Sequence, residues 1–211
     1  MSEQTLSTFQ NIPIGRLLRS SIQGCAVGCH LNQQTLPAFG DLLRIPLEPH
    51  LTIYGLVYDI HVDDDGLVRQ LASTAGIRPE VIEDNRQNRN VPLEMSVAFV
   101  GYEQNGVIAY LLPPHPPLTL DVIETCSTQD LLRFTHSRQL GYLRLLTNDP
   151  ALPTAELLAV HLRAAMTAHA DFDPEWQDHA IRAVIALLKD DPAQLINLLS
   201  ALSAAEGGLN D

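Results

Sequence analysis

The hydrophobic residues of this chain change their spacing at a proline-rich segment, Pro113–Pro117. Before this segment, apolar residues alternate with other residues, which is the period of a β-strand. After Ser127 they recur every three or four positions, which is the period of an amphipathic helix. The prolines cannot continue a helix and favour an extended path. We therefore expect a sheet-forming part followed by a helical part.

About six strands are predicted in the first part, near residues 12–22, 25–31, 41–47, 52–62, 93–103 and 107–112. In the fourth strand the even positions from 54 to 62 are apolar and form one face. In the fifth strand, Met95, Val97 and Phe99 alternate with Ala98, Val100 and Tyr102. Asn105-Gly106 supplies the positive φ angles of a tight hairpin turn. Such a set of strands closes more readily than it lies open, which predicts a closed six-stranded β-barrel.

The second part is predicted to be an antiparallel helical bundle, from about Pro153 to Glu206. Ser127 and Asp130 have the spacing of a capping box ahead of an earlier helix. Two bundle helices are expected to begin at Asp173-Pro174 and Asp191-Pro192, where Asp accepts from backbone amides and Pro fits the first turn. Three apolar faces are expected to pack together: Leu158, Leu162, Ala165, Met166 and His169; Ile181, Val184, Ile185 and Leu188; and Leu195, Leu198, Leu199 and Leu202.

These patterns together predict an α+β chain with four parts. They are an extended or disordered N-terminus (1–11), a barrel (12–126) with a helical insertion near 65–76, a helical domain (127–206) and a tail (207–211). Within the insertion, Asp65–Ala75 has the spacing of a short helix that stops at Gly76.

Composition excludes several classes of protein. A length of 211 residues with 45% hydrophobic content is sufficient for a sizeable core. No run approaches the roughly 18 apolar residues of a membrane span, and the first residues lack the basic and apolar regions of a signal peptide. A cytoplasmic protein is therefore expected. An odd, low cysteine count favours buried free thiols at Cys25, Cys29 and Cys126 over a disulfide framework.

The net charge of −12 argues against direct binding to nucleic acid. A protein that neutralises phosphates needs clustered basic residues, and Lys189 is the only lysine in the chain. Arg78, Arg86 and Arg89 lie close together in sequence, but acidic neighbours balance them.

No catalytic motif is present, which predicts a protein that is not an enzyme, with no cofactor and no catalytic residue. The chain contains no P-loop, GxGxxG, GxSxG or HExxH. Cys25, Cys29 and His30 lack a second pair of zinc ligands and read as a continuing strand. Asp63, Asp64 and Asp65 are contiguous, whereas calcium loops alternate their acidic ligands, so they read as a strand-to-helix turn and only a weak candidate for a divalent metal.

Two acid–base pairings remain as alternatives. Asp59 and His61 share one strand face, and His161 and His169 could act with Asp171 or Asp173 in the helices. Neither pairing has a recognisable nucleophile or oxyanion donor beside it.

The polar stretch from Asp84 to Asn90 has no apolar anchor, which predicts an exposed loop. Asp84, Arg86, Asn88 and Arg89 are therefore the sequence-based candidates for contact with a partner.

Three segments resemble the HAS-barrel family: Ile14–Arg16, Phe39–Ile45 and Tyr54–Ile60, read as IGR, FGDLLRI and YGLVYDI. The proline-rich exit and Val122–Cys126 are similar to the version of this barrel in HerA-type translocases. The family also includes the N-terminal barrels of ATP synthase α and β subunits. In such proteins the barrels pack side by side above a ring of motor domains, so the resemblance implies a role in protein assembly. Here helices stand where the motor would follow.

We therefore expect a non-enzymatic interaction or assembly module that binds a protein partner, such as a ring ATPase, or itself. One alternative is an accessory factor to a HerA-like ATPase in DNA repair or processing. The other is an unrecognised enzyme or a barrel that binds a small ligand, using Asp59, His61 and the acidic turn.

Overall fold

The structure is a computed structural model, and it describes residues 11–30, 36–62, 73, 78, 80, 92–137 and 139–207. The strands are β1 (Pro13–Ser20), β2 (Gly24–His30), β3 (Leu42–Glu48), β4 (Leu51–Val62), β5 (Pro92–Gln104), β6 (Val107–Ala109) and β7 (Val122–Thr125). The helices are α3 (Thr128–Thr135), α4 (Leu143–Thr147), α5 (Thr154–His169), α6 (Trp176–Leu188) and α7 (Pro192–Gly207). Of the helix predicted over Asp65–Ala75, the structure describes Ser73 alone, which is helical.

The predicted closed, six-stranded antiparallel barrel is confirmed. Its strands follow the order β2-β1-β7-β3-β4-β5, and the pairing of β2 with β5 closes the ring. The sixth member differs from the prediction, because β7 stands between β1 and β3. The predicted strand near 107–112 is the short β6. It lies outside the ring because β2 and β6 pair with different parts of the same edge of β5. β2 pairs with residues 92–98 of β5, and β6 pairs with residues 102–104.

A β-bulge in β4 decides which of its side chains enter the barrel. The bulge between Val57 and Asp59 shifts the register of β4, so Val57 and Ile60 both pack against the interior cluster. The predicted single face of β4 is therefore divided, because Tyr54 and Leu56 point outward. The Asn105-Gly106 turn is confirmed, with φ angles of 52° and 82°.

The barrel interior is packed with apolar side chains and thiols. Its buried members are Ile14, Leu17, Cys25, Val27, Cys29, Leu43, Ile45, Ile53, Val57, Leu93, Met95, Val97, Phe99 and Ile123. Glycines permit the close approach of the strands that this packing needs. A Cβ atom added at Gly15 would lie 2.4 Å from the Gly28 carbonyl oxygen.

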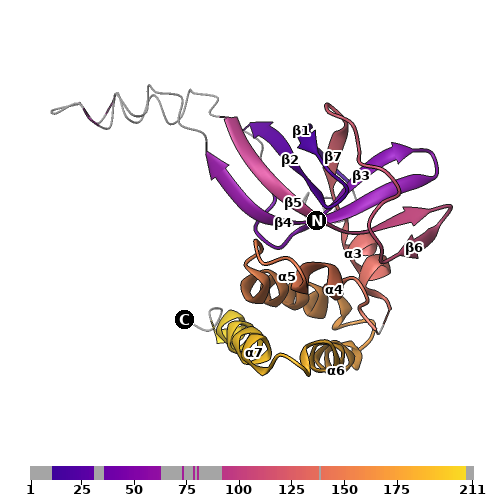
Figure 1. Cartoon of the computed structure of the whole chain (residues 1–211), viewed down its shortest axis with the longest axis vertical. Helices are drawn as coiled ribbons and strands as arrows, with labels where there is room; N and C mark the ends of the chain where they lie inside the picture. The colour runs from indigo at the N-terminus through magenta and orange to yellow at the C-terminus, as the bar shows by residue number, and fades with distance from the viewer. Residues whose placement is uncertain are drawn as a thin grey trace, which may run out of the picture.

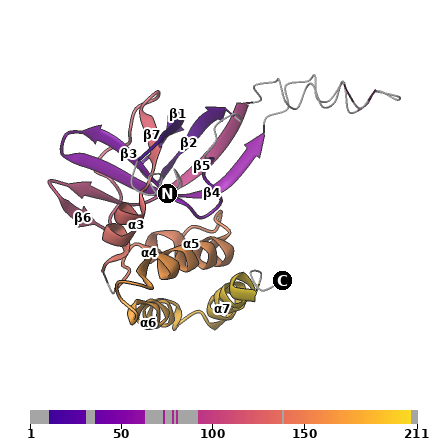
Figure 2. The same ribbon diagram turned by 180° about the vertical axis from the view of Figure 1, so that it is seen from behind.

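The helices form two layers beneath the barrel (Figures 1 and 2). The short α4 and the longer α5 lie against the barrel wall, and α6 and α7 lie beyond them. A second hydrophobic cluster joins the parts, since it unites Tyr54, Leu56 and Val100 of the barrel's outer face with Phe134 and Leu158 of the helices. The helical part therefore covers one side of the barrel.

The helix boundaries confirm two sequence predictions and correct a third. Ser127 caps α3 in a capping box with Asp130. Asp191 accepts from the Gln194 amide at the start of α7, at 3.0 Å. The predicted start at Asp173 is wrong, because α6 begins at Trp176. The Asp173 carbonyl instead accepts from the Trp176 amide in a turn that precedes the helix.

Among the described helices, no segment has the length and apolar character needed to cross a bilayer.

Candidate interaction surface

Several residues singled out from the sequence fall outside the described part of the chain. They are the acidic turn Asp63, Asp64 and Asp65 and the interaction candidates Asp84, Arg86, Asn88 and Arg89. Within the described residues, no group of three or more His, Cys, Asp or Glu side chains could hold a metal ion.

Cys25 and Cys29 point into the barrel, as their spacing on one strand predicts. Both are buried in the interior cluster beside Val27. Burial raises the pKa of Cys25 to about 12 and that of Cys29 to about 11. Both side chains are therefore neutral thiols at physiological pH and behave as small hydrophobic groups.

Cys126, Asp41 and His161 border a cavity of ≈ 170 Å³ between the barrel and α5. Three such residue types are the components of a thiol-based catalytic site, but their chemistry here is different. Burial raises the pKa of the Cys126 thiol well above its usual value, and it also raises the pKa of Asp41. The Cys126 thiol is therefore neutral, not the thiolate that nucleophilic chemistry requires.

His161 is held between the barrel and the helices. Its Nε2 shares a hydrogen bond with the Tyr142 hydroxyl at 2.9 Å. A backbone hydrogen bond with Gly40 raises its pKa but does not outweigh burial. Burial lowers the pKa of His161 to about 4. The side chain is therefore a neutral support between the barrel and α5.

His169 is also held in a structural network. Its ring stacks on Trp176 with centroids 4.5 Å apart, and its Nε2 lies 2.8 Å from the Thr135 hydroxyl. That hydroxyl donates to the Leu131 carbonyl, which leaves its oxygen to accept from His169. The sequence predicted a pairing of this histidine with Asp173. The negative charge of Asp173 raises the pKa of His169, which partly offsets the lowering caused by burial.

The structure does bring Asp59 and His61 together, on the outer surface of the barrel. His61 Nδ1 lies 3.5 Å from Asp59 Oδ2, and both side chains are exposed. The filled barrel interior does not open toward this pair.

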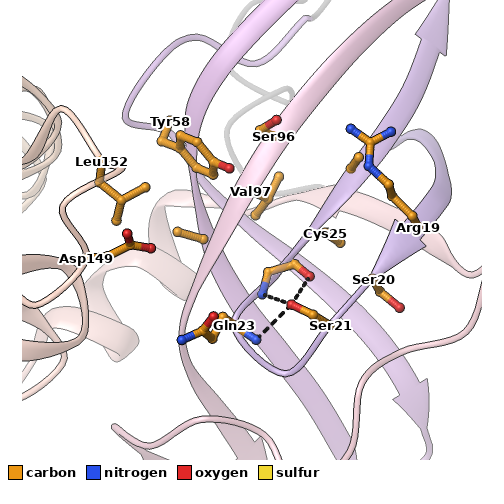
Figure 3. A pocket seen from close by; sticks show the side chains of 13 residues that line it. Arg19, Ser20, Ser21, Gln23, Cys25, Tyr58, Ser96, Val97, Asp149 and Leu152 are labelled. Carbon is orange, nitrogen blue, oxygen red and sulfur yellow. Dashed lines mark hydrogen bonds between the residues drawn. The ribbon is translucent and has the colours of Figure 1, made fainter.

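A polar hollow of ≈ 330 Å³ lies between the β1–β2 turn, β5 and the α4–α5 connection. Figure 3 shows Asp149 and Leu152 facing Tyr58 and Ser96 across it. Two of its polar side chains hydrogen-bond within the protein: the Ser21 hydroxyl accepts from the Gln23 and Gly24 amides, and the Asp149 carboxylate accepts from the Ala151 amide.

Three exposed leucines lie on two neighbouring backbone segments at β1. The segment 117–121 runs along the second half of β1, because the Leu17 amide donates to Asp121 and the Leu120 amide donates back to Leu17, at 3.0 and 2.9 Å. Leu18, Leu118 and Leu120, hereafter the β1 patch, are 49%, 72% and 65% exposed. Leu18 stands at a bulge in the β1–β2 ladder, between Leu17 and Arg19.

Leu120 has a backbone conformation that leucine rarely adopts, with φ of 70°. The left-handed region costs roughly 1–2 kcal/mol for a residue with a Cβ atom. The turn is fixed by Asp121, whose carboxylate accepts from the Leu118 amide at 2.7 Å. The fold therefore holds an exposed leucine in a strained position, which is more common at functional sites than elsewhere.

Arginines border the β1 patch in an otherwise acidic protein. Arg16 donates to the Leu120 carbonyl at 2.8 Å, and Arg19 forms an ion pair with the nearly buried Glu94. The Arg16 contact is with a neutral acceptor, so its positive charge remains at the edge of the patch.

Sequence reasoning missed the β1 patch. A pair of adjacent leucines at 17 and 18 could have given a signal, since strand alternation buries only one of them. Comparison with models of known families and with curated proteins finds no match to this chain.

Proposed function

We propose that this protein is a non-enzymatic assembly module, which docks another protein through the β1 patch. The observation that carries the proposal is the exposure of three leucines on two adjacent backbones, one of them in a strained conformation. Apolar patches that a fold actively presents are typical of protein–protein contacts.

The position of the patch supports this role. β1 lies across the ring from β4, whose outer face the helices cover, and Figure 1 shows it on the side of the barrel away from α6 and α7. The patch is therefore accessible while the helices cover the opposite wall. Arg16 at its edge favours a partner with an apolar centre and an acidic rim.

The resemblance to HAS barrels suggests the partner: a ring ATPase whose barrels pack side by side. β7 supports this idea, because it follows the proline-rich segment and lies in the stretch Val122–Cys126 that resembles the HerA-type barrel. It takes its place in the barrel between β1 and β3. The related candidate function is an accessory to a HerA-type translocase in DNA processing. It predicts binding to that motor and little affinity for bare DNA, so tight, salt-sensitive binding to DNA would contradict it.

The test is a binding measurement between this protein and a purified HerA-type ATPase ring, with a matched set of variants. Leu18→Ser, Leu118→Ser and Leu120→Asn together remove the apolar patch, and Asn is among the residues that tolerate the left-handed region. Each single change is expected to weaken binding by roughly tenfold, as for central interface residues. Leu111→Ser removes another exposed leucine, beyond β6, and should leave binding unchanged.

Unchanged binding by the triple variant, with the fold intact by circular dichroism, would refute docking through the β1 patch. Absence of binding to the ATPase by the unmodified protein would refute that partner. In that case, capture from cell extract should retain a protein that the triple variant loses, and failure of this differential capture would reject the assembly role.

A further inference from the structure

The polar hollow between the barrel and the α4–α5 connection has a floor of small residues. In the pairing of β2 with β5, Ala26 lies opposite Ser96 and Gly24 lies opposite Ala98. These positions alternate with residues that fill the barrel interior, so they face outward. No described side chain fills the space above them, which has a volume of ≈ 330 Å³. Sites for small ligands are typically clefts of about 300–1,000 Å³ that lie where two parts of a fold meet.

Three oxygen atoms face this hollow with no hydrogen-bond donor among the described residues. Asp149 Oδ1 accepts from the Ala151 amide at 2.9 Å, which leaves Oδ2 free. The hydroxyl groups of Tyr58 and Ser96 also line the hollow, and neither is engaged by a described residue. Figure 3 shows Asp149 on one wall and Tyr58 and Ser96 on the opposite wall. The three oxygens therefore come from β4, β5 and the α4–α5 connection and border one space.

The free oxygens match the hydrogen-bonding capacity of an ammonium group. A primary ammonium carries three N–H donors and no acceptor, so one such group can use all three oxygens. A carboxylate or phosphate would add further acceptors and would be repelled by Asp149. The net charge of −12 also attracts cations to the surface of the protein.

The basic residue at the hollow does not oppose a cation there. Among the described residues that line it, Arg19 alone is basic, and its ion pair with Glu94 offsets its charge. Asp149 forms no ion pair with a described residue. The uncompensated charge in the hollow is therefore negative.

The rest of the hollow defines the body of the ligand. Leu152 lies on the same wall as Asp149, and the methyl groups of Ala26 and Ala98 lie in the floor. These apolar groups fit a short hydrocarbon chain. At the β1–β2 turn the hollow is lined by the uncharged polar residues Ser21 and Gln23, which fit a neutral polar end.

We infer that the polar hollow binds a small organic amine. Its ammonium group hydrogen-bonds to Asp149, Tyr58 and Ser96. Its hydrocarbon chain lies against Leu152 and the floor, and its neutral polar end reaches the β1–β2 turn. This site is separate from the β1 patch, because none of the three patch leucines lines the hollow.

The test is an NMR titration of the full chain with aminobutanol, a short amine with a terminal hydroxyl group, and with butanediol as its neutral counterpart. Aminobutanol is expected to shift the backbone amide signals of Ser96 and Ala98 in a saturable manner. Butanediol should bind at least roughly tenfold more weakly, because it has fewer donors and no charge. Added salt should weaken binding of the amine, since it screens the attraction to Asp149.

Two variants that each remove one negative charge distinguish this site from general attraction to an acidic protein. Asp149→Asn keeps an oxygen that can accept from Ala151, so the turn should persist. It should weaken binding of aminobutanol by roughly tenfold or more. Asp178→Asn removes an exposed carboxylate on α6 and should leave binding unchanged. Tyr58→Phe removes one acceptor and should weaken binding by roughly fivefold.

Equal weakening by Asp149→Asn and Asp178→Asn would reduce the effect to diffuse attraction between charges and overturn the inference. Equal affinity for butanediol would overturn the role of the ammonium group. Absence of a saturable shift at Ser96 and Ala98 would overturn the site itself. Failure of partner docking by the β1 patch variants has no bearing on these results, because those variants leave the hollow intact.

Discussion

His161 is a buried base that the fold keeps neutral. Its pKa is about 4 in the folded protein against an ordinary value of 6.5. Between these values the unfolded chain binds a proton that the folded chain does not, so the free energy of unfolding falls as pH is lowered through this window. A pKa difference of this size corresponds to about 3 kcal/mol of unfolding free energy, which is lost as the pH falls to near 4. Above pH 6.5 His161 is neutral in both the folded and the unfolded chain, so the full stability is retained.

Chemical denaturation at a series of pH values between 4 and 7 measures this effect. His169 acts in the same direction, because its pKa is also lowered, whereas the raised pKa of Asp41 acts in the opposite direction. The His161→Gln variant should therefore show a shallower pH dependence than the unmodified protein. An NMR titration in which the His161 ring becomes protonated near pH 6.5 would contradict the prediction.

At single positions, the sequence predicted burial better than exposure. Cys25 and Cys29 are four residues apart on a strand, so alternation alone places both on one face, and the structure confirms that the face is interior. Leu18 could not be assigned in this way, because alternation exposes one of the adjacent Leu17 and Leu18 without showing which one. Leu120 depends on a turn fixed by Asp121, which is equally invisible in a hydrophobic pattern.

At the scale of the strands, close approach in the barrel depends on glycines at particular crossings. A Cβ at Gly15 would meet the Gly28 carbonyl oxygen at 2.4 Å and Cys29 Sγ at 2.8 Å. The atoms nearest to a Cβ at Gly28 would belong to the Leu18 side chain, at 3.1 Å or more. Gly15→Ala should therefore lower the free energy of unfolding by about 1–3 kcal/mol, as overpacking does, whereas Gly28→Ala should cost much less.

Urea denaturation of the two variants compares these costs directly. The backbone at Gly28 cannot yield without disturbing the β1–β2 ladder, whereas the exposed Leu18 side chain can rotate away. Equal destabilisation by both substitutions would show that the close approach of β1 and β2 at Gly15 does not determine the loss of stability.

The sequence predicted long strands with a regular alternation of apolar residues well. It predicted poorly the short strands whose place depends on how neighbouring strands pair. The β4 and β5 ranges are close to those expected, since both are long alternating runs. β7 has four residues, too few for a periodic signal, although it completes the ring. β6 was expected inside the ring, but its place follows from how β2 and β6 divide the edge of β5, which is a property of the assembled sheet.

For the whole molecule, the change of hydrophobic period correctly separated strands from helices, but it could not show that they share a core. Tyr54, Leu56 and Val100 look like ordinary outward positions of a barrel, yet they are buried by Phe134 and its neighbours. Tyr54 and Phe134 have ring centroids 4.9 Å apart, and Tyr110 donates a hydrogen bond to the Phe134 carbonyl. Covering one wall with helices leaves the β1 side free, which is the geometry that docking requires.

This shared core predicts that the barrel and the helices unfold in one transition. Trp176 is the only tryptophan and is buried in the helical part, so its fluorescence reports on the helices. In a Cys126→Ala variant the remaining thiols, Cys25 and Cys29, are both inside the barrel, so their reaction with a thiol reagent reports on the barrel. Both signals should change at the same urea concentration, as two-state behaviour requires.

Phe134→Ala provides the decisive comparison, because Phe134 belongs to a helix and contacts the barrel wall. Removal of a buried phenylalanine costs about 3–5 kcal/mol. If the parts are coupled, the substitution shifts the fluorescence and thiol transitions together by the same amount. If the fluorescence transition moves while the thiols of the barrel remain protected to the original urea concentration, the two parts fold independently and the common core does not stabilise them as a unit.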